Sequence, residues 1–150
     1  MTKTEAPPIL PTMVLPKPVE GFRFDKTKDE WELIENVALE GEPTLTLDTF
    51  LLEGESRMIG HIMLERSKED VENRGARAGQ LHAERILEQQ DKIPVEWRKF
   101  YLVFTGTVWR SPRGVLYVPC LRWYAAGWHL DWYWLGLNCY DYDRLVRLGK

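Results

Sequence analysis

The spacing of hydrophobic and polar residues changes twice along this chain. Between residues 56 and 93 the apolar positions recur every three to four residues, which is typical of amphipathic helices. From residue 97 onward they alternate with a period of two, which predicts strands. Residues 1–19 show neither period and contain five prolines. The pattern therefore predicts a disordered proline-rich tail over residues 1–19 and one domain over residues 20–150, whose fold class is α+β.

The helical region divides into two predicted helices. Ser56 is a suitable N-cap for the first helix, which is expected to run to about Asp70 and to bury Ile62. Leu87 is expected on the buried face of the second helix. That helix should end before Pro94, because proline disfavours helical backbone in the residue that precedes it.

Three strands are predicted in the last third of the chain, over residues 100–109, 115–124 and 128–135. Turn-forming residues separate them, so consecutive strands should form an antiparallel meander. In the third strand the period of two directs alternate residues to opposite faces. We expect Trp128, Leu130, Trp132 and Trp134 in the core, and His129, Asp131, Tyr133 and Leu135 on the outer face.

The segment before the helices predicts an N-terminal β-hairpin. Residues 22–24 and residues 31–37 are rich in apolar side chains, and the polar residues 25–30 between them suit a turn. Residues 45–52 contain another short apolar element. Both a strand and a helical turn remain open for it. The complete fold prediction is a C-terminal meander packed with a two-helix unit and this hairpin.

Charge and composition narrow the classes of function. The net charge is −3, but residues 1–54 carry 5 basic and 11 acidic side chains whereas residues 100–150 carry 6 and 3. This basic excess is too sparse for a nucleic-acid-binding surface. No apolar run reaches the ~20 residues of a membrane-spanning helix, and the start of the chain does not resemble a signal peptide. We therefore expect a cytoplasmic protein that binds no membrane.

Aromatic residues are concentrated near the C-terminus: six of seven tryptophans and all six tyrosines lie between residues 97 and 142. Core packing accounts for most of them. The others predict a recognition surface, because tryptophan, tyrosine and arginine are enriched at binding hot spots. We expect this surface where the first two strands pair, formed by Trp109, Arg110, Arg122 and Trp123. Stacking of single-stranded nucleic acid on the same residues is an alternative function.

Few residues of the sequence are candidates for catalysis or metal binding. His61 and Glu65 share a helix face but are two ligands where a metal site needs three or four, and His82 borders the apolar stripe of the second helix. His129 and Asp131 form a candidate acid/base pair, and a small enzyme built on them is a further alternative. The two cysteines are residues 120 and 139, too few for a disulfide framework. No nucleotide-binding or metal-binding motif is present, so no cofactor is expected.

Four segments resemble a group of small uncharacterised bacterial proteins, over roughly residues 50–150. The segments are Gly79–Glu84, Ile93–Arg98, Tyr101–Trp109 and Asp143–Arg147. That group has no assigned function, so the resemblance implies only that these segments form one recurring unit. Together with the aromatic surface, the sequence predicts a non-enzymatic protein-interaction or accessory module whose protein partner and oligomeric state are unknown.

Overall fold

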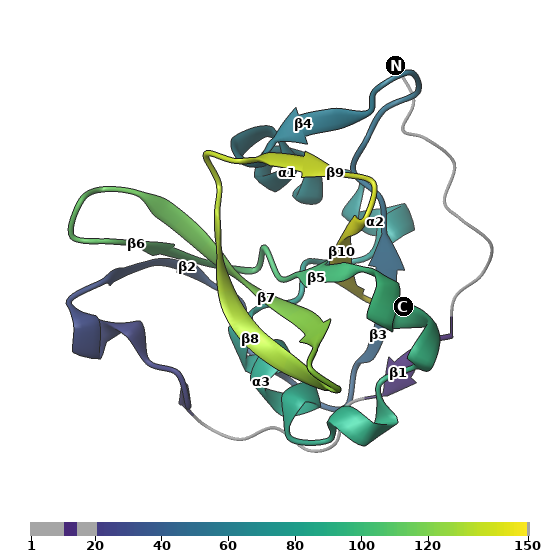
Figure 1. Cartoon of the computed structure of the whole chain (residues 1–150), viewed down its shortest axis with the longest axis horizontal. Helices are drawn as coiled ribbons and strands as arrows, with labels where there is room; N and C mark the ends of the chain where they lie inside the picture. The colour runs from purple at the N-terminus through teal and green to yellow at the C-terminus, as the bar shows by residue number, and fades with distance from the viewer. Residues whose placement is uncertain (1–10, 15–20, 150) are drawn as a thin grey trace.

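The computed structural model describes residues 11–14 and 21–149, whose strands form one large sheet and one short ribbon (Figure 1). Within these residues eight strands form the large sheet, and every pairing in it is antiparallel except β5 with β10. In spatial order the strands are β1 (Met13–Val14), β3 (Thr44–Asp48), β10 (Asp143–Leu148), β5 (Tyr101–Val103), β7 (Leu116–Tyr124), β6 (Thr107–Arg110) and β2 (Glu32–Asn36), with β8 (Gly127–Trp134) on the other edge of β7. The predicted α+β class and the meander β6–β7–β8 are confirmed.

The remaining elements cover the two faces of this sheet (Figure 1). They are the ribbon of β4 (Arg57–Ile59) with β9 (Asn138–Tyr140), the helices α1 (Gly60–Ser67), α2 (Val71–Arg74) and α3 (Gln80–Leu87), and the 3-10 turns η1 (Lys26–Asp29), η2 (Gln90–Lys92) and η3 (Val95–Lys99). One hydrophobic cluster packs under α3, and a second packs under α1. Both faces of the sheet are therefore buried over part of their area.

The predicted N-terminal hairpin is wrong. Residues 22–24 do not form a strand, because the backbone N–H groups of Arg23 and Phe24 donate to the carboxylate of Glu84 at 2.8 and 2.9 Å. β2 pairs instead with β6, where Leu33 lies opposite Trp109. A long-range contact with a helix thus replaces the local pairing that the sequence pattern favours. For the apolar element at residues 45–52 the sequence allowed a strand or a helical turn. Its first part is a strand, because residues 44–48 form β3.

Residues 11–14 are not disordered as the predicted tail requires, because they lie on the sheet. Residues 1–10 and 15–19 of the predicted tail lie outside the described residues. Met13 is 5 % exposed, and β1 pairs with β3 with Met13 opposite Leu45. The indole N–H of Trp97 donates to the carbonyl of Pro11 at 2.9 Å. One apolar side chain and main-chain pairing are enough to order this short segment on the sheet.

The predicted boundaries of the first helix are also wrong. Residues 57–59 form β4, and the helix begins at Gly60, whose N–H donates to the carbonyl of Leu137 at 2.8 Å. This start turns Met63 inward and leaves Ile62 41 % exposed, against the expectation. In α3 the side chain of Leu87 is half-buried against the core, and its neighbour Ile86 is fully buried.

The first predicted C-terminal strand is interrupted. Residues 100–109 form β5 and β6, and the main chain between them turns so that the N–H of Gly106 donates to Ala78 at 2.8 Å. Val108 consequently packs in the cluster under α1, whereas Leu102 packs in the cluster under α3. The alternation along β8 is followed only in its first half: Trp128 is buried, but Trp134 is 44 % exposed and Leu135 is fully buried. The prediction failed there because the sheet has a core on each face.

Two alanines in the turn between β7 and β8 adopt a strained, left-handed backbone conformation. Tyr124 pairs with Gly127, and the two residues between them, Ala125 and Ala126, have φ of 50° and 58°. Such a turn favours Asn-Gly, since left-handed backbone costs an alanine roughly 1–2 kcal/mol. The double change Ala125→Asn and Ala126→Gly should raise the free energy of unfolding by about 1 kcal/mol in urea titrations. Ala126→Val should lower it, and equal stability of the two variants would contradict this account.

Candidate functional site

The structure separates the four residues of the predicted recognition surface. Trp109 is fully buried, and its indole N–H donates to Oε1 of Gln80 at 2.7 Å. It is therefore a core residue, and the prediction of an exposed ring is wrong. Arg110 is exposed at the outer end of β6, where it forms an ion pair with Glu32 at 2.7 Å.

Arg122 and Trp123 lie farther along β7 and point to opposite faces. The register places Trp109 opposite Tyr117, so Arg122 follows five residues later, about 17 Å along the strand. Trp123 packs against the cluster under α3, and the guanidinium of Arg98 lies 3.8 Å from its ring centroid. The side chains of Arg110, Arg122 and Trp123 therefore do not form one continuous surface.

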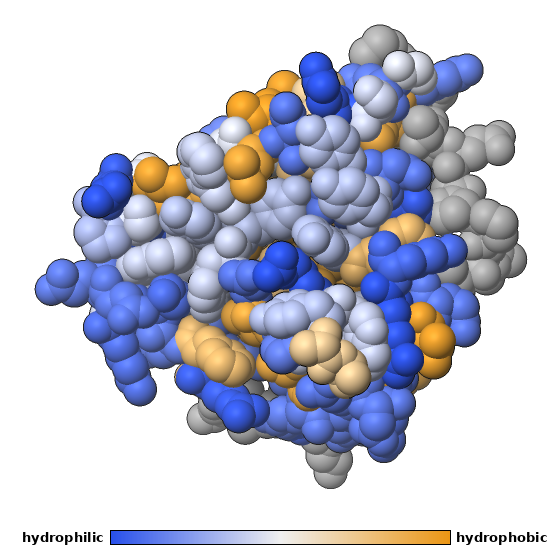
Figure 2. Space-filling view, viewed as in Figure 1, coloured by the Kyte–Doolittle hydropathy of each residue, from blue (hydrophilic) through white to orange (hydrophobic). Residues whose placement is uncertain are grey.

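A groove on the other face of β7 and β8 contains Arg122 and four of the six tyrosines. Its volume is about 490 Å³. The sheet supplies the floor, and the segment that passes through β9 supplies a wall. The lining residues are Tyr101, Cys120, Arg122, Asp131, Trp132, Tyr133, Trp134, Leu137, Asn138, Tyr140 and Tyr142. Figure 2 shows a band of intermediate hydropathy across the middle of this face, with charged residues around it.

Stacked rings form the wall of the groove. The rings of Tyr140 and Tyr142 stack with centroids 5.5 Å apart, and Tyr101 meets Tyr142 edge-on at the same distance. Tyr142 is 48 % exposed, so a ligand has direct access to its ring. Tyrosine presents an apolar ring and a polar hydroxyl with little conformational freedom, which suits it to contacts with a ligand.

One ion pair lies on the floor of the groove. A guanidinium nitrogen of Arg122 lies 2.9 Å from Oδ2 of Asp131. The other oxygen of Asp131, Oδ1, accepts the backbone N–H of Trp132 at 2.8 Å. Both oxygens of this carboxylate are thus engaged, and the side chain of Arg122 is 34 % exposed.

A buried carboxylate joins the floor to the wall. Oδ2 of Asp143 accepts the hydroxyl of Tyr133 at 3.0 Å and the backbone N–H of Tyr140 at 2.8 Å. Asp143 is fully buried, and burial raises its pKa to about 6. Sequence reasoning missed this residue and the tyrosines of the wall. The available signal was the spacing of Tyr140, Tyr142 and Asp143, which places a carboxyl beside two rings at a strand start.

The side chains of potential chemical reactivity on this sheet are buried or in contact with neighbouring groups. Burial raises the pKa of Cys120, on the floor, to about 12, and burial does the same for Cys139. The ring of His129 stacks on Tyr124 with centroids 3.9 Å apart, while Asp131 is held by Arg122 and the amide of Trp132. The candidate acid/base pair of His129 and Asp131 is thus not joined by a hydrogen bond in the described part of the chain. Likewise, His61 and Glu65 meet no third metal-ligating side chain there.

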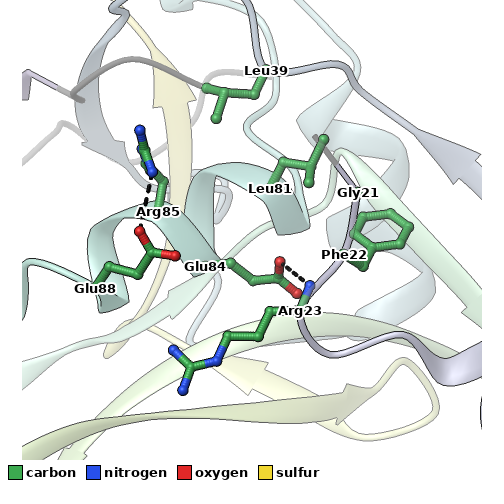
Figure 3. Close-up of a pocket in the computed structure, with 8 residues that line it drawn as sticks. All are labelled: Gly21, Phe22, Arg23, Leu39, Leu81, Glu84, Arg85 and Glu88. Atoms are coloured by element: carbon green, nitrogen blue, oxygen red, sulfur yellow. Dashed lines mark hydrogen bonds and ion pairs between the residues drawn. The ribbon is translucent and has the colours of Figure 1, made fainter. Parts of the chain in front are cut away.

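A smaller cavity lies between α3 and the segment that enters the domain (Figure 3). Its volume is about 220 Å³. Figure 3 shows the carboxylate of Glu84 directed at the backbone of Arg23, while Arg85 pairs with Glu88 at 3.1 Å. The other oxygen of Glu84 accepts the N–H of Phe24 and the amide of Gln80. This carboxylate anchors the entering segment, so the larger groove is the better candidate for ligand binding.

Two buried groups should make stability depend on pH in opposite directions. His82 is fully buried and accepts the N–H of Gly79 at 2.9 Å, and burial lowers its pKa to about 4. The contribution of the neutral His82 side chain to the free energy of unfolding is complete above pH 6.5. It is lost as the pH falls toward 4, by up to roughly 3 kcal/mol. The raised pKa of Asp143 gives stability at low pH that is lost as the pH rises through about 6.

The two effects should largely cancel between pH 6 and pH 4. Asp143→Asn removes one of them, so this variant should lose about 2–3 kcal/mol between pH 6.5 and pH 4 while the original protein changes little. Urea titrations across this range measure the difference. Asp141→Asn, at a side chain 73 % exposed, is the matched control and should keep the original profile. A flat profile for Asp143→Asn would show that His82 does not resist protonation in the folded state.

Comparison with known proteins does not assign this chain to a family. Among the residues that the structure describes, no helix is long and apolar enough to cross a membrane. No protein-family model, no curated protein and no solved structure matches the chain. The groove is therefore the main guide to the function.

Proposed function

We propose that this protein is a non-enzymatic protein-interaction module that binds a segment of another protein in the aromatic groove. The observation that carries the proposal is the groove of about 490 Å³, which tyrosine and tryptophan side chains line around the ion pair of Arg122 and Asp131. Its volume lies in the range of sites that enclose a few side chains or a small molecule. Exposed tyrosine, tryptophan and arginine together are the residue types that dominate protein-binding hot spots.

The state of the polar groups favours binding over catalysis. The thiols of Cys120 and Cys139 stay protonated at neutral pH because burial raises their pKa to about 12. A protonated thiol is a poor nucleophile. Arg122 is the one arginine or lysine among the described residues that line the groove, and Arg57 lies opposite Tyr140 in the adjoining ribbon. Two cations are few for a backbone that carries one charge per nucleotide. Both considerations support a polypeptide ligand.

Selection from a random library of displayed 12-residue peptides, with the full chain immobilised, tests the proposal. Enriched peptides should bind the original protein and lose at least tenfold in affinity when Tyr142 is replaced by alanine, because a stacked and accessible ring is lost. Arg122→Ala should weaken binding by a similar factor. Titration of the synthetic peptides measures each affinity.

The chain provides a matched control for each variant. Phe24 is an aromatic side chain 36 % exposed that does not line the groove. Arg110 forms an exposed ion pair comparable with that of Arg122. Phe24→Ala and Arg110→Ala should bind as the original protein does. The proposal fails if the library yields no binder, or if enriched peptides are insensitive to both groove variants.

A further inference from the structure

The outer edge of β8 presents main-chain N–H and C=O groups that are not paired with another of the described strands. β8 pairs with β7 on one side, and among the described strands none pairs with its other side. The N–H of Leu135, just after β8, donates to Leu116 of the neighbouring strand at 3.1 Å. Because successive residues of a strand point their main-chain groups to opposite sides, the even-numbered residues of β8 face the outer edge.

Side-chain oxygens cap this edge at two places. Oε1 of Gln90 accepts the N–H of Trp128 at 2.9 Å, and Oδ1 of Asp131 accepts the N–H of Trp132 at 2.8 Å. Leu130 lies between them, and by the same alternation its N–H and C=O face outward. Such caps protect an edge from uncontrolled pairing. The cap at Trp132 is a carboxylate whose other oxygen pairs with Arg122.

The groove reaches this edge. Its lining includes Asp131, Trp132, Tyr133 and Trp134, four consecutive residues of one strand. Consecutive side chains alternate between the two faces of a sheet. Contact with all four residues places the groove along this stretch of β8, beside its unpaired edge.

A cation beside the groove has no carboxylate partner among the described residues. Both oxygens of Asp131 are engaged, as described above. Arg57 is exposed and lies opposite Tyr140 in the β4–β9 ribbon, which places the two side chains on the same face. No carboxylate of the described residues forms an ion pair with Arg57. A ligand that reaches Arg57 is therefore best complemented there by a carboxylate.

We propose that the ligand of the groove is an extended, acidic segment of a partner protein that adds to the edge of β8 as a further strand. This inference rests on the proposed function and specifies its ligand. The partner's carbonyl takes the N–H of Trp132 from Asp131, its main chain pairs with Leu130, and its carboxylate pairs with Arg57. Main-chain pairing supplies affinity, and the alternate side chains in the aromatic groove supply specificity.

Two measurements on the peptides enriched by the display selection test the pairing. Methylation of single backbone nitrogens in the peptide should reduce affinity at least tenfold at alternate positions and have little effect at those between, because only every second N–H faces β8. Hydrogen exchange of the Leu130 and Trp132 amides should slow when the peptide is bound. The amide of Tyr133 faces β7 and serves as the internal reference.

A charge swap tests the acidic character. Selection against the original protein should enrich Asp and Glu, and selection against Arg57→Glu should enrich Lys and Arg instead. Arg113→Glu, in the exposed turn between β6 and β7, is the matched control and should enrich the same peptides as the original protein.

The outcomes separate this inference from the proposed function. Peptides that need Tyr142 but tolerate methylation at every backbone nitrogen would overturn strand addition and leave groove binding intact. Peptides without enriched acidic residues, or unaffected by Arg57→Glu, would overturn the acidic ligand. A library that yields no peptide dependent on Tyr142 would overturn both proposals.

Discussion

Replacing Asp48 with alanine is expected to lower the free energy of unfolding by about 3–5 kcal/mol. Its carboxylate accepts Nε of Arg147 at 2.7 Å and also pairs with Arg74. Arg147 is 1 % exposed, and its remaining contacts include the carbonyls of Ser67 and Gly75, at 3.0 and 2.9 Å. Without Asp48 the guanidinium stays charged in a buried position, and carbonyl dipoles alone do not offset its loss of hydration.

Asp29→Ala is the control for this prediction, because it also removes an aspartate from an ion pair. Its carboxylate lies 2.7 Å from Lys26, but the side chain is 61 % exposed. We expect a change within about 0.5 kcal/mol, since water solvates both charges when the exposed pair is broken. Urea titrations at pH 7 compare the two variants. A cost below about 1 kcal/mol for Asp48→Ala would mean that water reaches Arg147.

Gly75→Ala should cost more than about 3 kcal/mol, through backbone strain together with a steric clash. The φ of Gly75 is 93°, and a Cβ built there would lie 2.1 Å from the carbonyl oxygen of Leu148. That oxygen belongs to the main chain of β10 and cannot move without displacing the strand. The thermal midpoint of the variant should fall accordingly by about 6–12 °C, at roughly 2–4 °C per kcal/mol for a chain of this length.

Gly41→Ala separates the two causes. Gly41 has a φ of 63°, but a Cβ there meets nothing within 4 Å. Its substitution should cost only the conformational strain, about 1–2 kcal/mol. Equal losses at the two glycines would show that the contact with Leu148 relaxes freely. Because Gly75 and Asp48 both hold Arg147, their double variant should lose less than the sum of the single losses.

The candidate site was only partly accessible to prediction. The concentration of aromatic residues directed attention to the C-terminal strands, and Arg122 is the one of the four predicted residues that lines the groove. Trp109 was misplaced because the sequence does not reveal Gln80, its buried hydrogen-bond partner on a helix 29 residues earlier. Asp143 was not selected because its importance comes from Tyr133 and from burial, which are set by the folding of β9 over the sheet.

The sequence by itself determined the α+β class, the helical region and the meander of β6, β7 and β8. These features depend on local periodicity and on short turns, which act between neighbouring residues and are visible in any window of the chain. The register of the β7–β8 hairpin is also set locally, because only two residues separate Tyr124 from Gly127. The sequence pattern did not give this register, since it left three residues between the expected strands 115–124 and 128–135.

Only the tertiary structure decided which face of each element is buried. Residues 57–59 pair with β9, so that Met63 is buried as its place in the periodic pattern indicates, but Ile59 and Ile62 of the same pattern are exposed. The second cluster under α1 draws Leu135 inward at the end of β8, which exposes Trp134 beside the groove. These outcomes depend on contacts between segments far apart in the chain, where burial of apolar surface outweighs local preference and leaves no periodic trace in the sequence.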